Sequence, residues 1–245
     1  MTELEKIKEI IAKSDNIVFF GGAGVSTESG IPDFRGSGGL YTHDDYDSDV
    51  TPEEILHISY LMSNPKEFYS YYRQNMIYPD AEPNGAHYAL AELEKQGKLK
   101  AVITQNIDGL HQRAGSENVI ELHGSVEENY CVGCRKRYSL DYILDEAGVP
   151  YCESCGEMIR PDVVMYGEPL NASKFYQAAN TIYDADVLIV AGTSLTVNPA
   201  ASLIENYQGE HLIIINRDPT PYDHLAEFVI DDSIVDVLEY ITDNS

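Results

Sequence analysis

Four short apolar runs, separated by stretches with helical periodicity, dominate the hydrophobic pattern of the chain. They are Ile17–Phe20, Ala101–Thr104, Val187–Ala191 and Leu212–Asn216. Each is rich in β-branched residues and has the length of one buried strand. Strands that alternate with helices favour an α/β fold with a parallel sheet. Ligands bind such sheets at the carboxyl ends of the strands, so we expect the functional site where these runs end.

The first residues predict an amphipathic helix. Leu4, Ile7 and Ile11 share one face, and Thr2 and Glu5 have the spacing of a capping box. Acidic residues near the start and the lack of a long apolar stretch disfavour a signal peptide. No run of 18 apolar residues occurs, so we expect no membrane partner and a cytoplasmic protein.

Two segments interrupt the alternation of strands and helices. Residues 41–84 contain an acidic stretch and an aromatic helical run, and residues 126–159 contain all the cysteines. We expect both to be insertions that form a smaller lobe, while 1–40, 85–125 and 160–245 form the parallel-sheet domain. The acidic stretch, which contains Asp44, Asp45, Asp47 and Asp49, lacks the spacing of a calcium loop and is expected to be a solvated loop.

The cysteines form two C-x2-C pairs. Cys131 and Cys134 form the first pair, and Cys152 and Cys155 follow after 17 intervening residues. This spacing is typical of a zinc ribbon, in which each pair supplies two thiolates to a tetrahedral ion. Two disulfides or a redox pair are the alternatives, but a cytoplasmic chain disfavours disulfides and a redox motif needs no second pair. Four protein ligands leave no open position, so we expect a structural zinc.

The charge balance narrows the class of partner. With 41 acidic and 16 basic side chains, the formal net charge is -25. Phosphate binding needs a basic field, so a general nucleic-acid binder is excluded. If the substrate is a macromolecule, the charge favours a basic protein segment.

A glycine-rich loop follows the first apolar run. Gly21, Gly22 and Gly24 would let the backbone approach phosphate oxygens, and a following helix would offer its N-terminal amides. The usual dinucleotide spacing is absent, because Thr27 stands where a third glycine would fall. No Gly-Lys-Ser/Thr follows either. A nucleotide site and a plain tight turn both remain open from this loop alone.

Among the seven histidines, His123 has the most distinctive position. It follows the mostly apolar stretch Val119–Leu122 and precedes a glycine, which predicts a strand end where a general base could stand. His87 and His111 lie in helix-like runs and are expected to face the core or cap a helix. The other four, for which surface or packing roles are expected, are His43, His57, His211 and His224.

Taken in order, the motifs resemble the sirtuin family of NAD-dependent protein-lysine deacylases. They are GAGVSTESGIPDFRG, TQNIDGLHQRAG, ELHGS, the paired C-x-x-C, IRPDVVMYGE, AGTSL and INRD, and with Asp232 the resemblance runs from about residue 20 to residue 232. The resemblance implies a Rossmann-like NAD-binding domain with a smaller lobe made of a zinc ribbon and a helical module. NAD and an acetylated-lysine peptide would meet in the cleft between them.

The resemblance also implies roles for individual residues. His123 would be the general base, and Asn106 would orient the ribose and the attacking water. The residues expected to bind NAD are Gly22, Ala23, Gly24, Thr27, Asp33, Phe34, Arg35, Gln105, Asn106, Ile107, Asp108, His123, Gly192, Thr193, Ser194, Asn216 and Asp232. Those expected to contact the peptide are Val163, Val164, Tyr166, Gly167 and Glu168.

The implied reaction consumes NAD. The acetyl group passes from lysine to ADP-ribose, and nicotinamide is released. A mono-ADP-ribosyltransferase using the same NAD chemistry, a deacylase of other acyl-lysines and a non-enzymatic zinc-ribbon binding module are the alternatives. The presence of His123 together with an intact QNID segment favours the deacetylase.

One short segment bears on the choice of acyl group. Sirtuins that remove succinyl or malonyl groups carry a Tyr-x-x-Arg pair in the helical module. Here Tyr69 is followed at that spacing by Tyr72, and Arg73 stands one position later. On a helix this rotates the arginine by about 100°. The sequence therefore predicts a preference for neutral acyl groups, unless the run EFYSYYRQ is only a core-packing helix.

Overall fold

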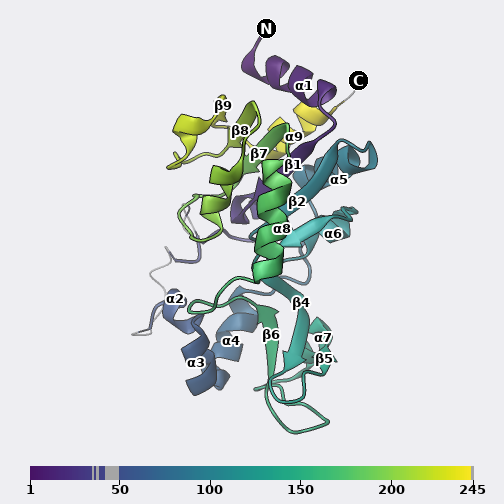
Figure 1. The fold of residues 1–245 in the computed structure, drawn as a ribbon. Helices are drawn as coiled ribbons and strands as arrows, with labels where there is room; N and C mark the ends of the chain where they lie inside the picture. Colours follow the sequence, from purple (N-terminus) through teal and green to yellow (C-terminus); the bar gives the residue numbers. More distant parts are fainter. Residues whose placement is uncertain (35, 37–38, 42–49, 244–245) are drawn as a thin grey trace.

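The computed structural model describes residues 1–34, 36, 39–41 and 50–243. Arg35 and the four aspartates of the acidic stretch lie outside these residues. Two lobes can be followed in Figure 1: a large one that carries α1 and α9 at its far end, and a small one that contains α2, α3, α4 and β6. No helix in the described part of the chain is both long and apolar enough to cross a membrane.

The large lobe is built on a parallel sheet of six strands in the order β3-β2-β1-β7-β8-β9. The four predicted strands are confirmed as the central ones: β1 (Ile17–Gly21), β2 (Leu99–Thr104), β7 (Val187–Ala191) and β8 (His211–Ile215). Two short edge strands complete it, β3 (Val119–Glu121) and β9 (Phe228–Ile230). The central strands show no alternation of apolar and polar residues, because helices cover both faces of the sheet.

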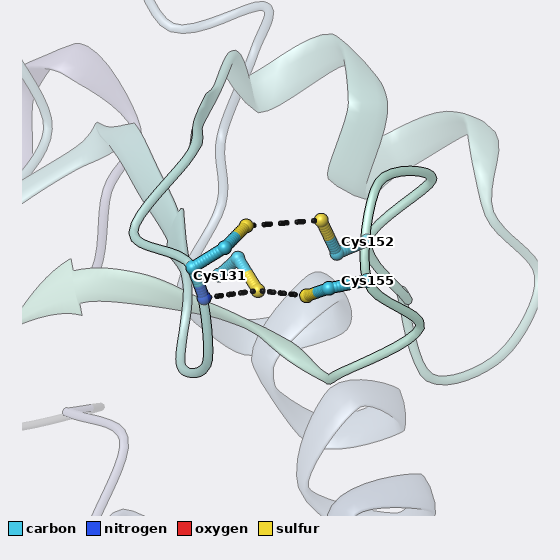
Figure 2. Close-up of side chains that lie close together, drawn as sticks. Cys131, Cys152 and Cys155 are labelled. Carbon is cyan, nitrogen blue, oxygen red and sulfur yellow. Dashed lines mark hydrogen bonds between the residues drawn. The ribbon is translucent and has the colours of Figure 1, made fainter.

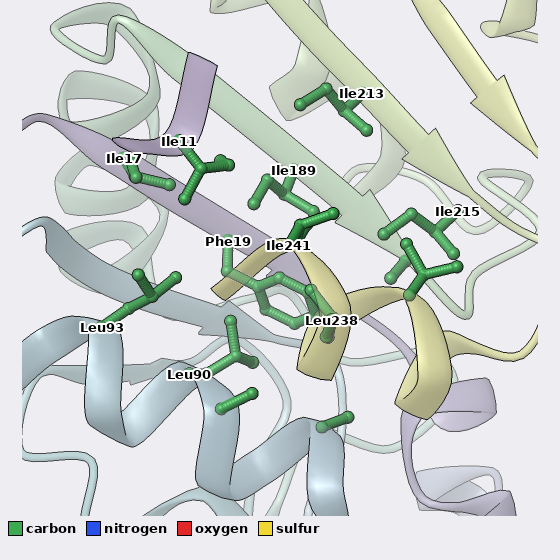
Figure 3. Close-up of a cluster of buried hydrophobic side chains, with 14 of the residues drawn as sticks. Ile11, Ile17, Phe19, Leu90, Leu93, Ile189, Ile213, Ile215, Leu238 and Ile241 are labelled. Carbon is green, nitrogen blue, oxygen red and sulfur yellow. The ribbon is translucent and has the colours of Figure 1, made fainter. Parts of the chain in front are cut away.

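Successive residues of the strands feed two separate cores. Ile17 and Phe19 of β1 pack with α1 (Glu3–Lys13), α5 (Gly85–Lys95) and α9 (Ile234–Thr242), as Figure 3 shows. Val18 and Phe20 pack on the other face with α8 (Ala172–Tyr183) and η3 (Ala201–Asn206).

The expected N-terminal helix is α1. Ile7 and Ile11 are buried, and both halves of the Thr2–Glu5 capping box are formed.

The small lobe combines helices with an antiparallel sheet of the order β5-β4-β6. The strands are β4 (Gly124–Cys131), β5 (Arg137–Tyr138) and β6 (Ile159–Val163), and the helices are α2 (Pro52–Ile55), α3 (Ile58–Ser63), α4 (Pro65–Asn75) and α7 (Leu140–Asp145). Together they enclose a third hydrophobic core. The α/β fold with a smaller inserted lobe is thus confirmed. The small sheet extends to Val163, beyond the expected boundary at residue 159.

Candidate functional site

A cavity of about 1070 Å³ opens at the carboxyl ends of β1, β2 and β7 and extends to residues of the small lobe. Every described residue that the sequence assigned to NAD or peptide binding lines it. These are Gly22, Ala23, Gly24, Thr27, Asp33, Phe34, Gln105, Asn106, Ile107, Asp108, His123, Val163, Val164, Tyr166, Gly167, Glu168, Gly192, Thr193, Ser194, Asn216 and Asp232. Arg35 lies outside the described residues.

The glycine loop after β1 differs from the expected strand-to-helix turn. Two 3₁₀ turns follow the strand, η1 (Ala23–Val25) and η2 (Thr27–Ser29), so no α-helix offers its N-terminus here. The Gly24 amide donates to the Gly192 carbonyl at 2.9 Å. A Cβ on Gly24 would lie 2.7 Å from the Gly192 Cα, and Gly192 itself has a φ of +62°. Both glycines are therefore needed for the loops after β1 and β7 to pack together.

Ser26, which the sequence analysis did not single out, connects this loop to the QNID segment. Its hydroxyl donates to Asp108 Oδ2 at 2.7 Å and accepts from Asn106 Nδ2 at 3.1 Å. Because the only hydroxyl proton goes to the carboxylate, Ser26 can only accept from Asn106. The Asn106 amide is thereby oriented, which leaves its Oδ1 as the acceptor available to a ligand. The only sequence signal was the position of Ser26 between Gly24 and Thr27.

Gln105 joins two strand ends. Its backbone amide donates to the Gly21 carbonyl at 3.0 Å, and its Nε2 donates to Thr193 Oγ1 at 2.9 Å. The glutamine therefore supports the rim of the cavity with its side chain. Its backbone carbonyl remains free to accept from His123.

His123 stands between β3 and β4, where the two lobes join. Its Nδ1 lies 2.9 Å from the Gln105 carbonyl oxygen. A carbonyl can only accept, so Nδ1 carries the proton and Nε2 keeps a lone pair. Burial lowers the pKa of His123, and the Gln105 hydrogen bond offsets this only in part. The imidazole is therefore neutral near pH 7, with Nε2 able to act as a base.

The segment Val163–Glu168 forms the opposite wall of the cavity. The Val164 amide donates to the His123 carbonyl at 2.9 Å, which ties this wall to the histidine. Arg160 donates to both Glu168 oxygens, at 2.6 and 2.8 Å, and its side chain is 9% exposed. Burial opposes the charge on Glu168, but the bonds from Arg160 and from the Met165 amide together outweigh it and hold the pKa of the carboxyl below its usual value. Glu168 therefore holds this wall in shape with both carboxylate oxygens.

The adenosine end expected from the sequence is built from strand ends. Asn216 follows β8, and its Nδ2 donates to the Asp218 carbonyl at 2.6 Å. Asp232 precedes α9 and accepts from the Ser233 amide at 2.8 Å. Ser194 lies 2.8 Å, Oγ to Oγ1, from Thr196 in the loop after β7. Each side chain lines the cavity, with its orientation fixed locally.

The four cysteines converge in the small lobe. Their sulfur atoms all lie within 4.8 Å of one another, and no disulfide joins them (Figure 2). Tyr138 donates from its hydroxyl to Cys152 Sγ at 3.1 Å, which lowers the pKa of that thiol to about 6. Four thiols on two tight turns match the donor set and geometry of a structural zinc site, so the residues fit the expected ion.

Two further histidines are fully buried beside the site. The rings of His87 and His111 lie 4.7 Å apart, centroid to centroid. Burial lowers the pKa of His87 to about 4 and that of His111 to about 3, so both are neutral near pH 7. Asn84, which caps α5 together with His87, also donates to the Val25 carbonyl at 2.8 Å. The pair therefore lies under the loop that follows β1 and is part of its support.

Arg73 is held away from the cavity. Its Nε donates to the Ile143 carbonyl at 2.8 Å and its Nη2 to the Gly148 carbonyl at 2.6 Å. Tyr69 is fully buried and donates to the Ile159 carbonyl. Neither side chain belongs to the cavity wall, whereas Tyr72 does. The aromatic run is thus mainly a packing helix, and its arginine ties α4 to the ribbon.

Comparison with known proteins gives consistent matches. The model of the Sir2 family matches residues 22–199. The chain is 52% identical over 242 residues to the NAD-dependent protein deacetylase of Clostridium perfringens, covering 98% of this chain and 99% of that protein. It is 54% identical over 239 residues to the protein of the same name in Clostridium tetani, covering 97% and 96%.

Solved structures agree over the same length. One contains a Sir2 protein with a deacetylated p53 peptide and 3′-O-acetyl ADP-ribose; its TM-score is 0.88 at 40% identity, with 98% of this chain and 97% of that chain covered. Another contains Sir2 with a p53 peptide and NAD+, with a TM-score of 0.84 at 39% identity and the same coverage.

Proposed function

The chain belongs to the Sir2 family, the sirtuins, and we propose that it is an NAD-dependent protein-lysine deacetylase. In this reaction the acetyl group passes from lysine to ADP-ribose and nicotinamide is released. The observation that carries the proposal is the placement of a neutral His123, with a free Nε2, in one cavity with the glycine loop and the Val163–Glu168 wall. Relatives at about half identity over the whole chain support it.

The NAD site is proposed to follow the strand ends. The loops after β1 and β7 meet through Gly24 and Gly192 and expose backbone there, where phosphate oxygens could approach closely. Asn216 and Asp232 stand at the β8 and β9 ends, which suits the adenosine half. Bound NAD supplies a ribose carbon from which nicotinamide can leave.

The residues of this chain then have defined tasks. His123 Nε2 takes a proton from a ribose hydroxyl, while the Gln105 carbonyl holds its Nδ1 proton. Asn106 presents Oδ1 to the ribose or to water, because Ser26 holds its Nδ2. Positioning of this kind contributes because the reacting groups are fixed before the reaction begins.

The peptide is proposed to lie as an extra strand between Val163–Glu168 and the segment after Ser194. Backbone pairing tolerates many sequences, so selectivity among acetylated proteins is expected to be broad. The strongly negative net charge favours peptides with basic residues beside the acetylated lysine.

The zinc ion would hold Cys131, Cys134, Cys152 and Cys155 together and take no part in the reaction. A cytoplasmic location is part of the proposal, since cysteines stay reduced there and can bind zinc.

Mass spectrometry of all products tests the proposal against its alternatives. The protein is incubated with NAD and an acetyl-lysine peptide. Acetyl-ADP-ribose together with deacetylated peptide is the expected result. ADP-ribose attached to protein would instead indicate a mono-ADP-ribosyltransferase, and unconsumed NAD would indicate a binding module. The comparisons and His123 favour the deacetylase over both.

A further inference from the structure

We propose that Tyr41 and Tyr166 form a hydroxyl link that makes NAD binding and peptide binding depend on each other. Their two hydroxyl oxygens lie 2.9 Å apart, and both residues line the cavity. Both would be positioning residues, because the link acts through the segments that carry them. This inference rests on the proposed function and goes beyond it by assigning a role to two hydroxyl groups.

Tyr166 is fixed from the small-lobe side. Its amide donates to the Leu56 carbonyl at 3.1 Å, and its carbonyl accepts from the Ile58 amide at 3.0 Å. The Arg160–Glu168 pair closes the same segment from behind. The Tyr166 hydroxyl therefore stands at a defined place on the peptide-facing wall.

Tyr41 is fixed from the side that faces the glycine loop. Its amide donates to the Phe34 carbonyl at 2.9 Å, and the Leu40 amide donates to the Asp33 carbonyl at 2.8 Å. The rings of Phe34 and Tyr41 make an edge contact with centroids 5.4 Å apart. A ligand that presses on Asp33 or Phe34 therefore also constrains the Tyr41 hydroxyl.

The link joins two segments that contact different ligands in the proposed reaction. Asp33 and Phe34 face the NAD end, whereas Tyr166 faces the peptide end. Because the two hydroxyls are bonded to each other, a ligand that holds one segment in this arrangement also holds the other, so each ligand should strengthen the other by the same factor. A hydrogen bond of ordinary net strength corresponds to a coupling of about 2- to 10-fold.

Calorimetry on matched variants tests the link. Binding of an acetyl-lysine peptide is measured with and without saturating ADP-ribose, which lacks the nicotinamide and cannot react. The proteins are wild type, Tyr41→Phe, Tyr166→Phe and the double variant. Tyr222→Phe, which removes a hydroxyl bonded to Glu205 outside the cavity, is the control.

We expect ADP-ribose to tighten peptide binding in the wild type and in Tyr222→Phe. Each single variant should lower that factor by about 2- to 10-fold. The double variant should lose no more than either single one. An unchanged factor in the single variants, or losses that multiply in the double variant, would overturn the link. A purely structural role would weaken the binding of each ligand measured by itself and leave the coupling factor unchanged.

The deacetylation assay separates the two proposals. If the wild type does not deacetylate the peptide, the proposed function fails. If it does, but the coupling factor is the same in all variants, only this inference fails.

Discussion

A single backbone hydrogen bond decides which nitrogen of His123 can accept a proton. The Gln105 carbonyl holds the proton on Nδ1, and burial keeps the ring neutral. Sequence reasoning found the residue from its place after an apolar stretch, but the tautomer depends on Gln105, which lies 18 residues earlier in the chain. The structure therefore adds the reason why Nε2, and not Nδ1, is the nitrogen that can accept a proton in the proposed reaction.

The pH profile of the reaction should follow this imidazole. Because its pKa lies below 6.5, kcat/KM for deacetylation should stay constant as the pH is lowered past 6.5 and should fall only once Nε2 becomes protonated.

Replacing the imidazole tests the same role directly. His123→Ala should lose about 100-fold or more in rate with an unchanged circular dichroism spectrum. His224→Ala, on a polar turn, is the control. An acidic limb above pH 6.5, or an alanine variant with a tenth of the rate, would remove His123 from the base role.

Arg73 gives a second prediction about a single residue. Its guanidinium is bonded to the Ile143 and Gly148 carbonyls. A carboxylate at the end of an acyl chain would therefore lose its water in the cavity without gaining an arginine partner, which is unfavourable. On one peptide, kcat/KM should be at least about 10-fold higher for acetyl-lysine than for succinyl-lysine. Arg73→Gln should leave this ratio unchanged. Equal turnover of the succinyl peptide would show that the arginine leaves its carbonyl partners and reaches the acyl group.

Among secondary-structure elements, the strands differ in how far the sequence predicts them. The four central strands have helices on both faces, which makes each a continuous apolar run. The edge strand β9 has three residues, too few for a pattern to stand out, whereas β3 corresponds to the apolar stretch before His123 that predicted a strand end. The helix expected after β1 is replaced by 3₁₀ turns, in which the Val25 and Ser26 amides donate to the Gly22 and Ala23 carbonyls.

Motifs placed the cavity residues, but motifs could not reveal the contacts between distant segments. Ser26 meets Asp108 across 82 positions, and Tyr41 meets Tyr166 across 125. Such pairs depend on how strand ends and lobes come together. No local periodicity or spacing records that arrangement.

The zinc ribbon should be an element that depends on its metal. Cys152→Ser should lose zinc, measured by plasma mass spectrometry, together with a lower thermal midpoint, because metal binding and folding are coupled. Tyr138→Phe keeps four thiols but removes the hydroxyl bonded to Cys152, so zinc should bind about 10- to 100-fold more weakly. Freshly purified protein without zinc, or with a disulfide between the pairs, would contradict the assignment.

The buried pair on α5 and α6 (Leu110–Ala114) should make stability depend on pH. The folded pKa values of His87 and His111 are lowered to about 4 and 3, so the unfolded chain binds more protons below pH 6.5. Their contribution is complete above pH 6.5 and declines as pH falls, by up to about 1.4 kcal/mol per pH unit for each ring. Denaturant melts of wild type and His111→Phe measure it. Between pH 6 and pH 5, the part of the slope of unfolding free energy against pH that comes from this pair should be about half as large in the variant. An equal slope in both proteins would argue that His111 is not held neutral by burial.

For the whole molecule, the position of the cavity matters more than any one side chain. The sheet domain supplies the loops after β1, β2 and β7, and the small lobe supplies the opposite wall through the strand pair β4 and β6. His123 lies at the crossing from one lobe to the other. Two ligands that bind from opposite sides would therefore meet at the base, which is the arrangement that acyl transfer to a cofactor requires.

The proposed reaction is tested most directly by a quenched time course that quantifies all three products. Wild-type protein with NAD and an acetyl-lysine peptide should release nicotinamide, deacetylated peptide and acetyl-ADP-ribose in equal amounts. His123→Ala should form neither deacetylated peptide nor acetyl-ADP-ribose at a comparable rate. Deacetylated peptide formed without NAD, or nicotinamide released with no acetyl-ADP-ribose, would contradict the proposed reaction.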